Sequence, residues 1–548
     1  MRASLRLTLL ALGLFACADD REVLPPGNGG RIAGPDAILP RAGAAGAATA
    51  GAAGAATAGA AGAATAGAAG VSGAAGGGAA GASGGAAGSS TGGAAGAGGG
   101  AAGVAGASGS AAAGAGGAAG TAGAAGAGAG GAAGAGGASG SAGAPPGSIV
   151  LETFNVALAG IGVEHLTDRR QPSYDAIAAS PADVICLQEA WQQVDKDGYI
   201  AAAKATLPYS YFAATDNTTP YTDDRDLTGA SPTPPTTAPC AASTTKLDAA
   251  ITCASTSCST TGDSSGYVTS LDCVKTKCVG AAAGLLVGSA DDKRCYGCFA
   301  PQLASEKISD IRNICTTQVR DGVAYQGQSS PLLLSRYPLK DKQTYVLPAA
   351  WFRRVILKAT LTHPTKGDVD VYCNHVNPIY AASFLYPYTS QHGAGGASAN
   401  AWENEHALHV KRTVEWVNAT SGAEPAIILG DFNASPEFKD GSGAVITKGD
   451  GAANLKILTD AFAIATASGY TPACTFCAEN PLIPAADKAP YTPEWIDFVF
   501  LKGIPVANVS ATSRVYTAFS VAAKDPVGQT VQVPLSDHYG LRTTLALP

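Results

Sequence analysis

The sequence predicts an α+β domain that follows a long segment unable to form a core. From residue 148 onward, short apolar runs with strand-like patterning outnumber segments with helical spacing, and polar residues recur where the runs end. Residues 42–147 are almost entirely Ala and Gly, and such a segment cannot bury enough apolar surface to fold. We therefore expect one folded domain at residues 148–548.

Residues 1–17 have the pattern of an export signal. Positive charge at Arg2 and Arg6 precedes an apolar run at residues 7–15, which is too short to span a bilayer. The run ends in LFAC at residues 14–17, which resembles the lipobox of bacterial lipoproteins. This resemblance implies lipidation of Cys17 and attachment to an outer membrane or cell surface, with plain secretion as the alternative.

Residues 18–147 are interpreted as a disordered tether. No Asp, Glu, Lys or Arg occurs between Arg41 and Glu152, and AGAAGAAT repeats at residues 42–65. About 100 residues of this composition have a mean reach of roughly 50–60 Å. A tether of this length would hold the folded domain well clear of a membrane surface.

Strands make up most of the predicted domain. Strand-like runs occupy residues 148–156, 183–187, 330–335, 355–362, 368–374, 426–431, 495–501, 513–519 and 539–547. Helical spacing is found at residues 172–179 and 403–417. His406 and His409 fall in the second helix, and we interpret them as part of a solvated helix face rather than as a metal-binding pair.

A segment rich in Thr, Ser, Pro and Cys interrupts the domain at about residues 213–317. The cysteines in it are Cys240, Cys253, Cys258, Cys273, Cys278, Cys295, Cys298 and Cys315. In an exported protein, an even cluster without nearby histidine predicts four disulfides of unknown pairing, with a zinc site as the alternative. Cys474 and Cys477 are expected to form a local bridge. Cys186 and Cys373 lie in apolar strands and are interpreted as buried thiols.

Polar residues occur in or next to six of the apolar runs. They are Asn155, Glu189, His375, the pair Asp431 and Asn433, Asp497, and the pair Asp537 and His538. Asp431 and Asn433 lie two positions apart in LGDFN at residues 429–433, so both point to one side of an extended chain. An ordinary strand-ending turn also explains this single motif. Because the pattern recurs along the domain, we favour one polar site at a sheet edge.

The motifs that contain these residues occur in the order TFN, LQE, SRYP, NHVNP, GDFN, WIDFVF and SDH. This order resembles that of the endonuclease/exonuclease/phosphatase superfamily, which has the deoxyribonuclease I fold. The resemblance covers residues 148–212 and 318–548 and implies a four-layer α/β/β/α sandwich, with the Cys-rich segment as an insertion. LSDHYG at residues 535–540 also looks like the ending of the neutral sphingomyelinase branch.

The resemblance implies hydrolysis of phosphoesters with the help of Mg²⁺ or Mn²⁺. A catalyst of this reaction must neutralise charge, position water and protonate a leaving oxygen, and carboxylate oxygen is a preferred ligand of Mg²⁺. The family pattern implies Glu189 as the main metal ligand, with Asn155 and Asp537 beside it.

The same pattern implies roles for the remaining polar residues. His538 would be the general base, oriented by Asp497, while Asp431 would orient water or serve the leaving oxygen. Asn433 would hydrogen-bond the phosphate, and His375, as a catalytic residue, would donate to a phosphate oxygen or to the leaving group. His375 lies in HVNP, which resembles the HxxP segment of the deoxyribonuclease branch, but no carboxylate partner for it can be identified in the sequence.

The natural substrate stays open between a lipid head group and nucleic acid. From residue 148 onward there are 30 lysines and arginines against 38 aspartates and glutamates, a net charge of −8, which disfavours a long polyanion. The HxxP segment favours nucleic acid. The aromatic loop Tyr380, Phe384, Leu385, Tyr386 and Tyr388 suits either lipid contact or internal packing. A non-catalytic, surface-displayed binding module on the same fold is the alternative function.

Overall fold

The structure is a computed structural model of the 548-residue chain. It describes residues 147–548 apart from 160–162, 232–235, 259–273, 275–276, 306–307, 320–323, 380–385, 387–399, 484–487, 489–491 and 525–527. The expected signal, the Cys17 lipidation site and most of the tether lie outside the described residues and stay predictions. Within the described part of the chain, no helix combines the length and the apolar character needed to cross a membrane.

The first of two six-stranded sheets has the strand order β13-β16-β1-β2-β4-β3. Its strands are β1 (Ser148–Asn155), β2 (Val184–Gln188), β3 (Tyr209–Phe212), β4 (Leu332–Ser335), β13 (Val509–Val515) and β16 (Gly540–Ala546). β1 pairs parallel with β2 and antiparallel with β16. The chain therefore returns at its end to the strand with which the domain begins.

The second sheet has the order β11-β12-β8-β7-β6-β5. Its strands are β5 (Leu339–Leu347), β6 (Arg354–His363), β7 (Gly367–His375), β8 (Ala426–Asp431), β11 (Ala463–Ile464) and β12 (Asp497–Lys502). Two small sheets pair β9 (Phe438–Lys439) with β10 (Val445–Thr447), and β14 (Val521–Lys524) with β15 (Thr530–Val533). Short 3₁₀ helices occur at Ala324–Gly327 and Val506–Asn508.

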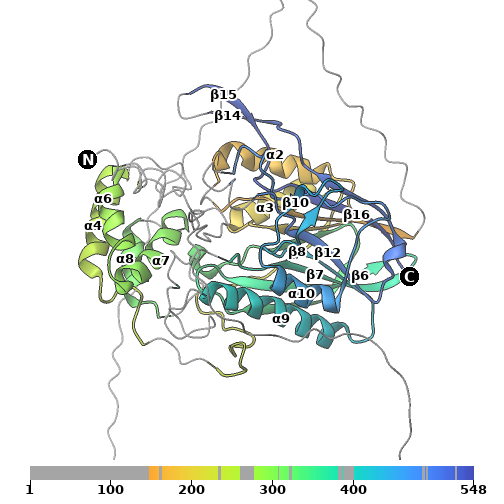
Figure 1. The fold of residues 1–548 in the computed structure, drawn as a ribbon, viewed down its shortest axis with the longest axis horizontal. Coiled ribbons are helices and arrows are strands. Elements are labelled where there is room, and N and C mark those ends of the chain that lie inside the picture. Colours follow the sequence, from red (N-terminus) through yellow and green to blue (C-terminus); the bar gives the residue numbers. More distant parts are fainter. Residues whose placement is uncertain are drawn as a thin grey trace, which may run out of the picture. The chain divides into compact units, whose positions relative to one another are not determined.

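The two large sheets pack face to face, and helices cover their outer faces. Alternate residues such as Leu151 on β1 and Leu429 on β8 share one core between the sheets. Helices α2 (Leu166–Ala178) and α3 (Gln193–Ala203) lie on one side of the strands, and α9 (Ala401–Ser421) and α10 (Ala452–Ala461) on the other (Figure 1). The predicted four-layer sandwich is confirmed.

The described residues of the Cys-rich insertion include several helices. Its helices are α4 (Thr244–Cys258), α6 (Val279–Leu286), α7 (Ala290–Ser305) and α8 (Ile308–Thr317). Disulfides join Cys240 to Cys295, Cys253 to Cys278, and Cys298 to Cys315. Cys258 is also disulfide-bonded, while Cys273 lies outside the described residues. The disulfides leave these seven cysteines without a thiolate for zinc, so the disulfide interpretation is the correct one for them.

The prediction of buried thiols at Cys186 and Cys373 is wrong. The two cysteines form a disulfide between β2 and β7, across the core that the two sheets share. Both residues are fully buried, as expected from their apolar strands. The sequence does not reveal that these strands, 187 residues apart, belong to facing sheets. Cys474 and Cys477 form the expected local bridge.

The prediction of a solvated face at His406 and His409 is also wrong, because both side chains are fully buried. His406 Nε2 donates to Phe432 O at 2.9 Å, and His409 Nε2 donates to Pro348 O at 2.5 Å. Their helix, α9, packs against the second sheet and also contributes Trp402 to the core of the insertion. Because α9 is covered by the second sheet and by the insertion, it buries polar residues that would face water on a helix with a single apolar face.

Candidate active site

Strand pairing brings the predicted polar residues to one edge of the sandwich. In the first sheet, Asn155 pairs with Gln188, the residue before Glu189. In the second sheet, Asp431 pairs with both His375 and Asp497. The carboxyl ends of β1, β2, β7 and β8 thus coincide with the start of β12, and the side chains of five separate strands can meet there.

Asn155 joins the two sheets at this edge. Its Nδ2 donates to Glu189 Oε1 at 3.2 Å and to Asp431 Oδ2 at 2.9 Å. Its Oδ1 accepts the backbone N–H of Ala157 at 3.0 Å. Asn155 therefore orients two carboxylates at once. The metal-ligand role predicted for Asn155 would use Oδ1, which accepts this one hydrogen bond with one of its two lone pairs; that role stays a prediction.

His538 and Asp497 form a buried hydrogen-bonded pair. His538 Nδ1 lies 3.0 Å from Asp497 Oδ2, and both side chains are almost completely buried. Burial lowers the pKa of His538, but the negative charges of Asp497, Asp537 and Asp431 outweigh it and raise that pKa to about 10. With Nδ1 directed at Asp497, the ring exposes Nε2 as the atom that can exchange a proton.

His375 has the opposite surroundings. Its Nδ1 lies 2.6 Å from Arg354 Nη1 and 2.9 Å from Ser330 Oγ. A guanidinium can only donate, so Nδ1 accepts and the ring proton is on Nε2. Burial, together with the charge of Arg354, lowers the pKa of His375 well below its ordinary value. His375 is therefore a neutral imidazole whose donor, Nε2, lies 3.6 Å from Asp431 Oδ2.

Asp431 and Asn433 form a compact turn at the end of β8. The backbone N–H of Asn433 donates to Asp431 Oδ1 at 2.9 Å, and Asn433 Nδ2 donates to Val376 O at 2.8 Å. Asn433 has a φ of 46°, a left-handed conformation that Asn tolerates better than most residues. Burial and the charge of Asp497 raise the pKa of Asp431 to about 7. The motif therefore forms the strand-ending turn, and the same turn brings Asp431 next to Asn155; the catalytic role of Asp431 stays a prediction.

The site carries an excess of buried negative charge. Glu189, Asp431, Asp497 and Asp537 are all more than nine-tenths buried. Burial, followed by the charge of Asp537, raises the pKa of Glu189. Among the described residues, Asp497 Oδ1 is buried without a hydrogen-bond partner. Carboxylates crowded in this way are costly unless a cation balances them, so the residues present fit a divalent ion.

Two groups of residues in the site offer oxygen or nitrogen ligands. One is the predicted set around Glu189 and Asp537. The other is Asp431, Asp497 and His538, whose ligating atoms lie within 4.8 Å of one another. The Nδ1 of His538 is already engaged by Asp497, and the imidazole holds its proton strongly. We therefore favour the carboxylates of Glu189 and Asp537 as the residues that would hold a metal ion.

The family model of the Endonuclease/Exonuclease/phosphatase family matches residues 153–538. The chain belongs to this family. The match begins at Thr153, beside Asn155, and ends at His538, so it spans all the polar residues predicted for the site. Family membership makes the protein a phosphoester hydrolase by relationship. No curated protein matches the chain significantly.

Solved structures of low identity are also similar to the chain. Sphingomyelinase C from Streptomyces griseocarneus is 15% identical over 73% of this chain and 99% of its own, with a TM-score of 0.40. A Staphylococcus aureus beta toxin mutant with bound magnesium ions is 13% identical over 72% of this chain and 99% of its own, with a TM-score of 0.35. An endonuclease/exonuclease/phosphatase from Beutenbergia cavernae is 13% identical over 73% of this chain and 72% of its own, also with a TM-score of 0.35.

The sequence did not reveal the hydrogen-bond network that reaches the Nδ1 of His375 through Arg354. Arg354 also donates from Nε to Asn377 Oδ1 at 2.6 Å, and the amide of Asn377 donates to Glu405 on α9. Tyr386 donates its hydroxyl to the same Glu405 and is buried, so this member of the aromatic loop packs internally. The other four lie outside the described residues. Two adjacent arginines, 353 and 354, at the start of an apolar strand were the signal that could have indicated this network.

Proposed function

We propose that the protein is a metal-dependent phosphodiesterase. The observation that carries this proposal is the buried His538–Asp497 pair at the same sheet edge as two further buried carboxylates, Glu189 and Asp537. A pure binding module has no need for a buried imidazole whose pKa three neighbouring carboxylates raise. Family membership supports the same conclusion independently.

In this proposal, His538 would take the proton of the attacking water at Nε2 in its neutral form, which a divalent cation beside the carboxylates would favour by offsetting the negative charge that raises its pKa. Asp497 fixes the tautomer and the ring orientation through Nδ1. Asp431, held by Asn155 and by its own turn, orients the water or the leaving oxygen. A divalent cation near Glu189 would supply the positive charge that a phosphate group and the carboxylates need.

His375 serves the phosphate as a neutral donor. Its Nε2–H is fixed as the donor because Arg354 occupies Nδ1. The lowered pKa means that His375 does not hold a second proton to give away at neutral pH. We therefore assign it hydrogen bonding to a non-bridging phosphate oxygen rather than protonation of the leaving group. Asn433 contributes a second contact from the neighbouring turn.

For the substrate, we propose a phosphodiester with a small or zwitterionic head group, such as a phospholipid. Two observations support it over a long polyanion. The net charge of residues 148–548 is −8, and the site itself is rich in buried carboxylates. In addition, the Nδ1 of His375 is paired with Arg354 and Ser330 rather than with a carboxylate. Nucleic acid is the second candidate, favoured by the HVNP motif at residues 375–378.

Export to an oxidising compartment is part of the proposal. Disulfides such as Cys186–Cys373 and Cys240–Cys295 support it, because disulfides persist mainly outside the cytosol. The signal-like residues 1–17 and the Ala/Gly-rich tether fit a protein displayed on a surface through Cys17.

Hydrolysis of bis(p-nitrophenyl) phosphate tests the reaction class. We expect turnover with Mg²⁺ or Mn²⁺, loss of turnover with a chelator, and a decrease in kcat of about 1000-fold for His538→Ala. His363→Gln is the matched control, because His363 lies at the other end of β6 from Arg354. Absence of metal-dependent turnover in the wild-type protein would leave the binding module as the better interpretation.

Competition between natural substrates then tests the substrate class. Sphingomyelin vesicles and supercoiled plasmid DNA are compared at equal phosphodiester concentration. We expect faster release of phosphocholine from the vesicles than nicking of the plasmid. Preferential nicking would assign the enzyme to nucleic acid instead.

A further inference from the structure

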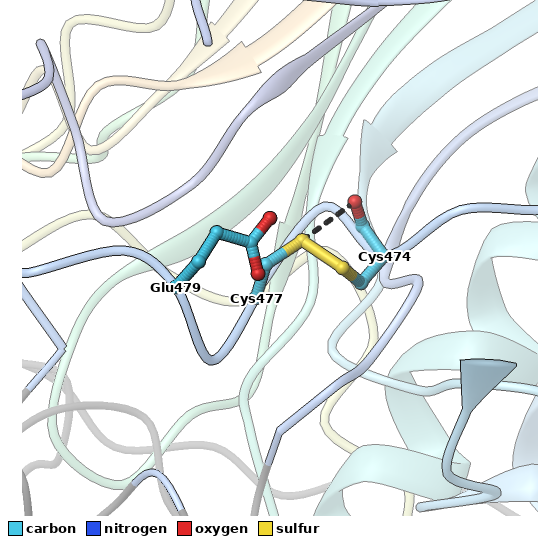
Figure 2. Close-up of side chains that lie close together, drawn as sticks. All are labelled: Cys474, Cys477 and Glu479. Carbon is cyan, nitrogen blue, oxygen red and sulfur yellow. Dashed lines mark hydrogen bonds between the residues drawn. A yellow bond between two sulfur atoms is a disulfide. The ribbon is translucent and has the colours of Figure 1, made fainter. Parts of the chain in front are cut away.

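A small disulfide loop lies directly beside the His538–Asp497 pair. Cys474 and Cys477 are joined to each other, and only Thr475 and Phe476 lie between them. Figure 2 shows this disulfide with the carboxylate of Glu479 next to it. The loop connects to neither sheet as a strand, yet both of its middle residues contact the backbone that carries the pair.

The loop is not suited to hold a metal ion, although two sulfurs and a carboxylate gather there. The disulfide leaves no thiolate to act as a ligand. In addition, Arg514 Nη1 lies 3.1 Å from Cys477 Sγ and 3.6 Å from Glu479 Oε1. A guanidinium already supplies the positive charge, so the loop requires another explanation.

Thr475 contacts the backbone on both sides of the pair. Its Oγ1 accepts the N–H groups of Ile496 and Asp497, each at 3.2 Å. Its backbone oxygen accepts the N–H of Tyr539, the residue after His538, at 2.8 Å. Thr475 is completely buried. One residue therefore connects the start of β12, which carries Asp497, to the segment that carries His538.

Phe476 supports the same connection. Its backbone N–H donates to Glu494 O at 3.0 Å and its oxygen accepts the Glu494 N–H at 2.8 Å. Its ring lies 5.3 Å from the ring of His538, measured between centroids. The loop thus contacts the His538 ring through the side chain of Phe476, and the backbone N–H of Asp497 through Thr475 Oγ1.

We propose that Thr475 is a positioning residue for the His538–Asp497 pair, held in place by the Cys474–Cys477 disulfide. This inference rests on the proposed function, because it assigns a role in that same reaction. Thr475 touches no phosphate-binding or metal-binding residue named above. Its loss should therefore disturb the alignment of the pair and leave substrate binding intact.

Replacement of Thr475 by Val and by Ser separates this role from simple packing. Val has a similar shape but no oxygen, whereas Ser keeps the oxygen and loses only a methyl group. For Thr475→Val we expect kcat on bis(p-nitrophenyl) phosphate to fall about tenfold, because small misplacements of catalytic groups are costly, while KM stays within about twofold. Thr475→Ser should restore most of kcat.

Hydrogen exchange provides a readout that does not depend on activity. In Thr475→Val, the amides of Ile496 and Asp497 lose their acceptor and should exchange faster, and Thr475→Ser should restore their protection. Unchanged kcat and unchanged exchange in Thr475→Val, with an active wild-type protein, would overturn the inference. If the wild-type protein has no turnover, the proposed function fails, and faster exchange in Thr475→Val would still report the contact itself.

The disulfide is tested with a matched pair of double variants. Cys474→Ser/Cys477→Ser opens the loop beside the catalytic pair, and Cys253→Ser/Cys278→Ser opens a disulfide of the insertion. We expect Cys474→Ser/Cys477→Ser to lower kcat several-fold and to speed hydrogen exchange at residues 496–497. We expect Cys253→Ser/Cys278→Ser to leave kcat and this exchange unchanged. Equal kcat for the two variants would contradict the role assigned to the loop.

Discussion

The two histidines of the site have the same side chain and opposite surroundings. His538 is enclosed by carboxylates, which raise its pKa to about 10. His375 is enclosed by an arginine and a serine, and its pKa is lowered well below the ordinary value. Both are buried to nearly the same degree, so burial does not explain the difference. The charge of the neighbouring side chain decides which histidine handles protons and which one donates a fixed hydrogen bond.

This comparison also explains why the Nδ1 of His375 has no carboxylate partner. A carboxylate at Nδ1 would make the ring cationic and a competitor of His538 for protons. Arg354 instead fixes one tautomer and one charge state. The site therefore divides proton transfer and phosphate binding between two residues that could otherwise exchange roles.

The largest expected effect comes from removing the negative charge of Asp497, which distinguishes the surroundings of His538 from those of His375. Asp497→Asn keeps the size of the side chain, but it removes the negative charge and allows an N–H to face Nδ1. We expect kcat to fall about 1000-fold, measured with bis(p-nitrophenyl) phosphate. Asp195→Asn serves as a control, since Asp195 is a buried carboxylate paired with Arg170 and has no place in the proposed mechanism. A loss of equal size in both variants would mean that the effect is structural.

A smaller effect is expected from Glu405, which supports the His375 side of the site. Burial raises the pKa of Glu405 from 4.5 to about 7. The folded state therefore binds a proton that the unfolded state releases, so this contribution to stability is present below pH 4.5 and is lost as the pH rises through about 7. We expect the free energy of unfolding of the wild-type protein to fall by about 3 kcal/mol more than that of Glu405→Gln over this range. Urea titrations at several pH values measure this difference. Plots of unfolding free energy against pH that run parallel for the two proteins would contradict the prediction.

The smallest expected effect concerns the tautomer of His375. In Arg354→Met, Nδ1 loses its charged donor, and the ring is free to place its proton on either nitrogen. We expect kcat/KM to fall about tenfold, as for the loss of one hydrogen bond to a charged group. Nitrogen chemical shifts of the labelled imidazole report the tautomer directly. Arg354→Lys, which keeps a cationic donor, should preserve more of the Nε2–H form than Arg354→Met.

The sequence predicted the parts of the structure that depend on local pattern. Strands such as β8 and β6 were found within one or two residues, because buried strands are continuous apolar runs. The polar residues at the ends of these strands were found for the same reason. Sheet pairing then explains why Asp431 meets both His375 and Asp497.

The parts that were missed depend on contacts between distant segments. Arg354 and Glu405 are ordinary charged residues in the sequence, and only their burial reveals a network. The insertion has helical segments that composition concealed, since Thr, Ser and Cys are weak helix formers. Thr475 was overlooked because its two acceptor contacts are to backbone amides, which leave no pattern in side-chain types.

The Cys186–Cys373 disulfide encloses the whole insertion in a covalent ring. Residues 213–317 lie between its two cysteines, so a single protease cut anywhere from residue 187 to residue 372 leaves two pieces that remain chemically joined. After a cut within the insertion, Glu189 would stay on one piece and His538 on the other, both held at the same sheet edge. The insertion can therefore be nicked, lengthened or replaced while the two halves of the site stay attached to each other.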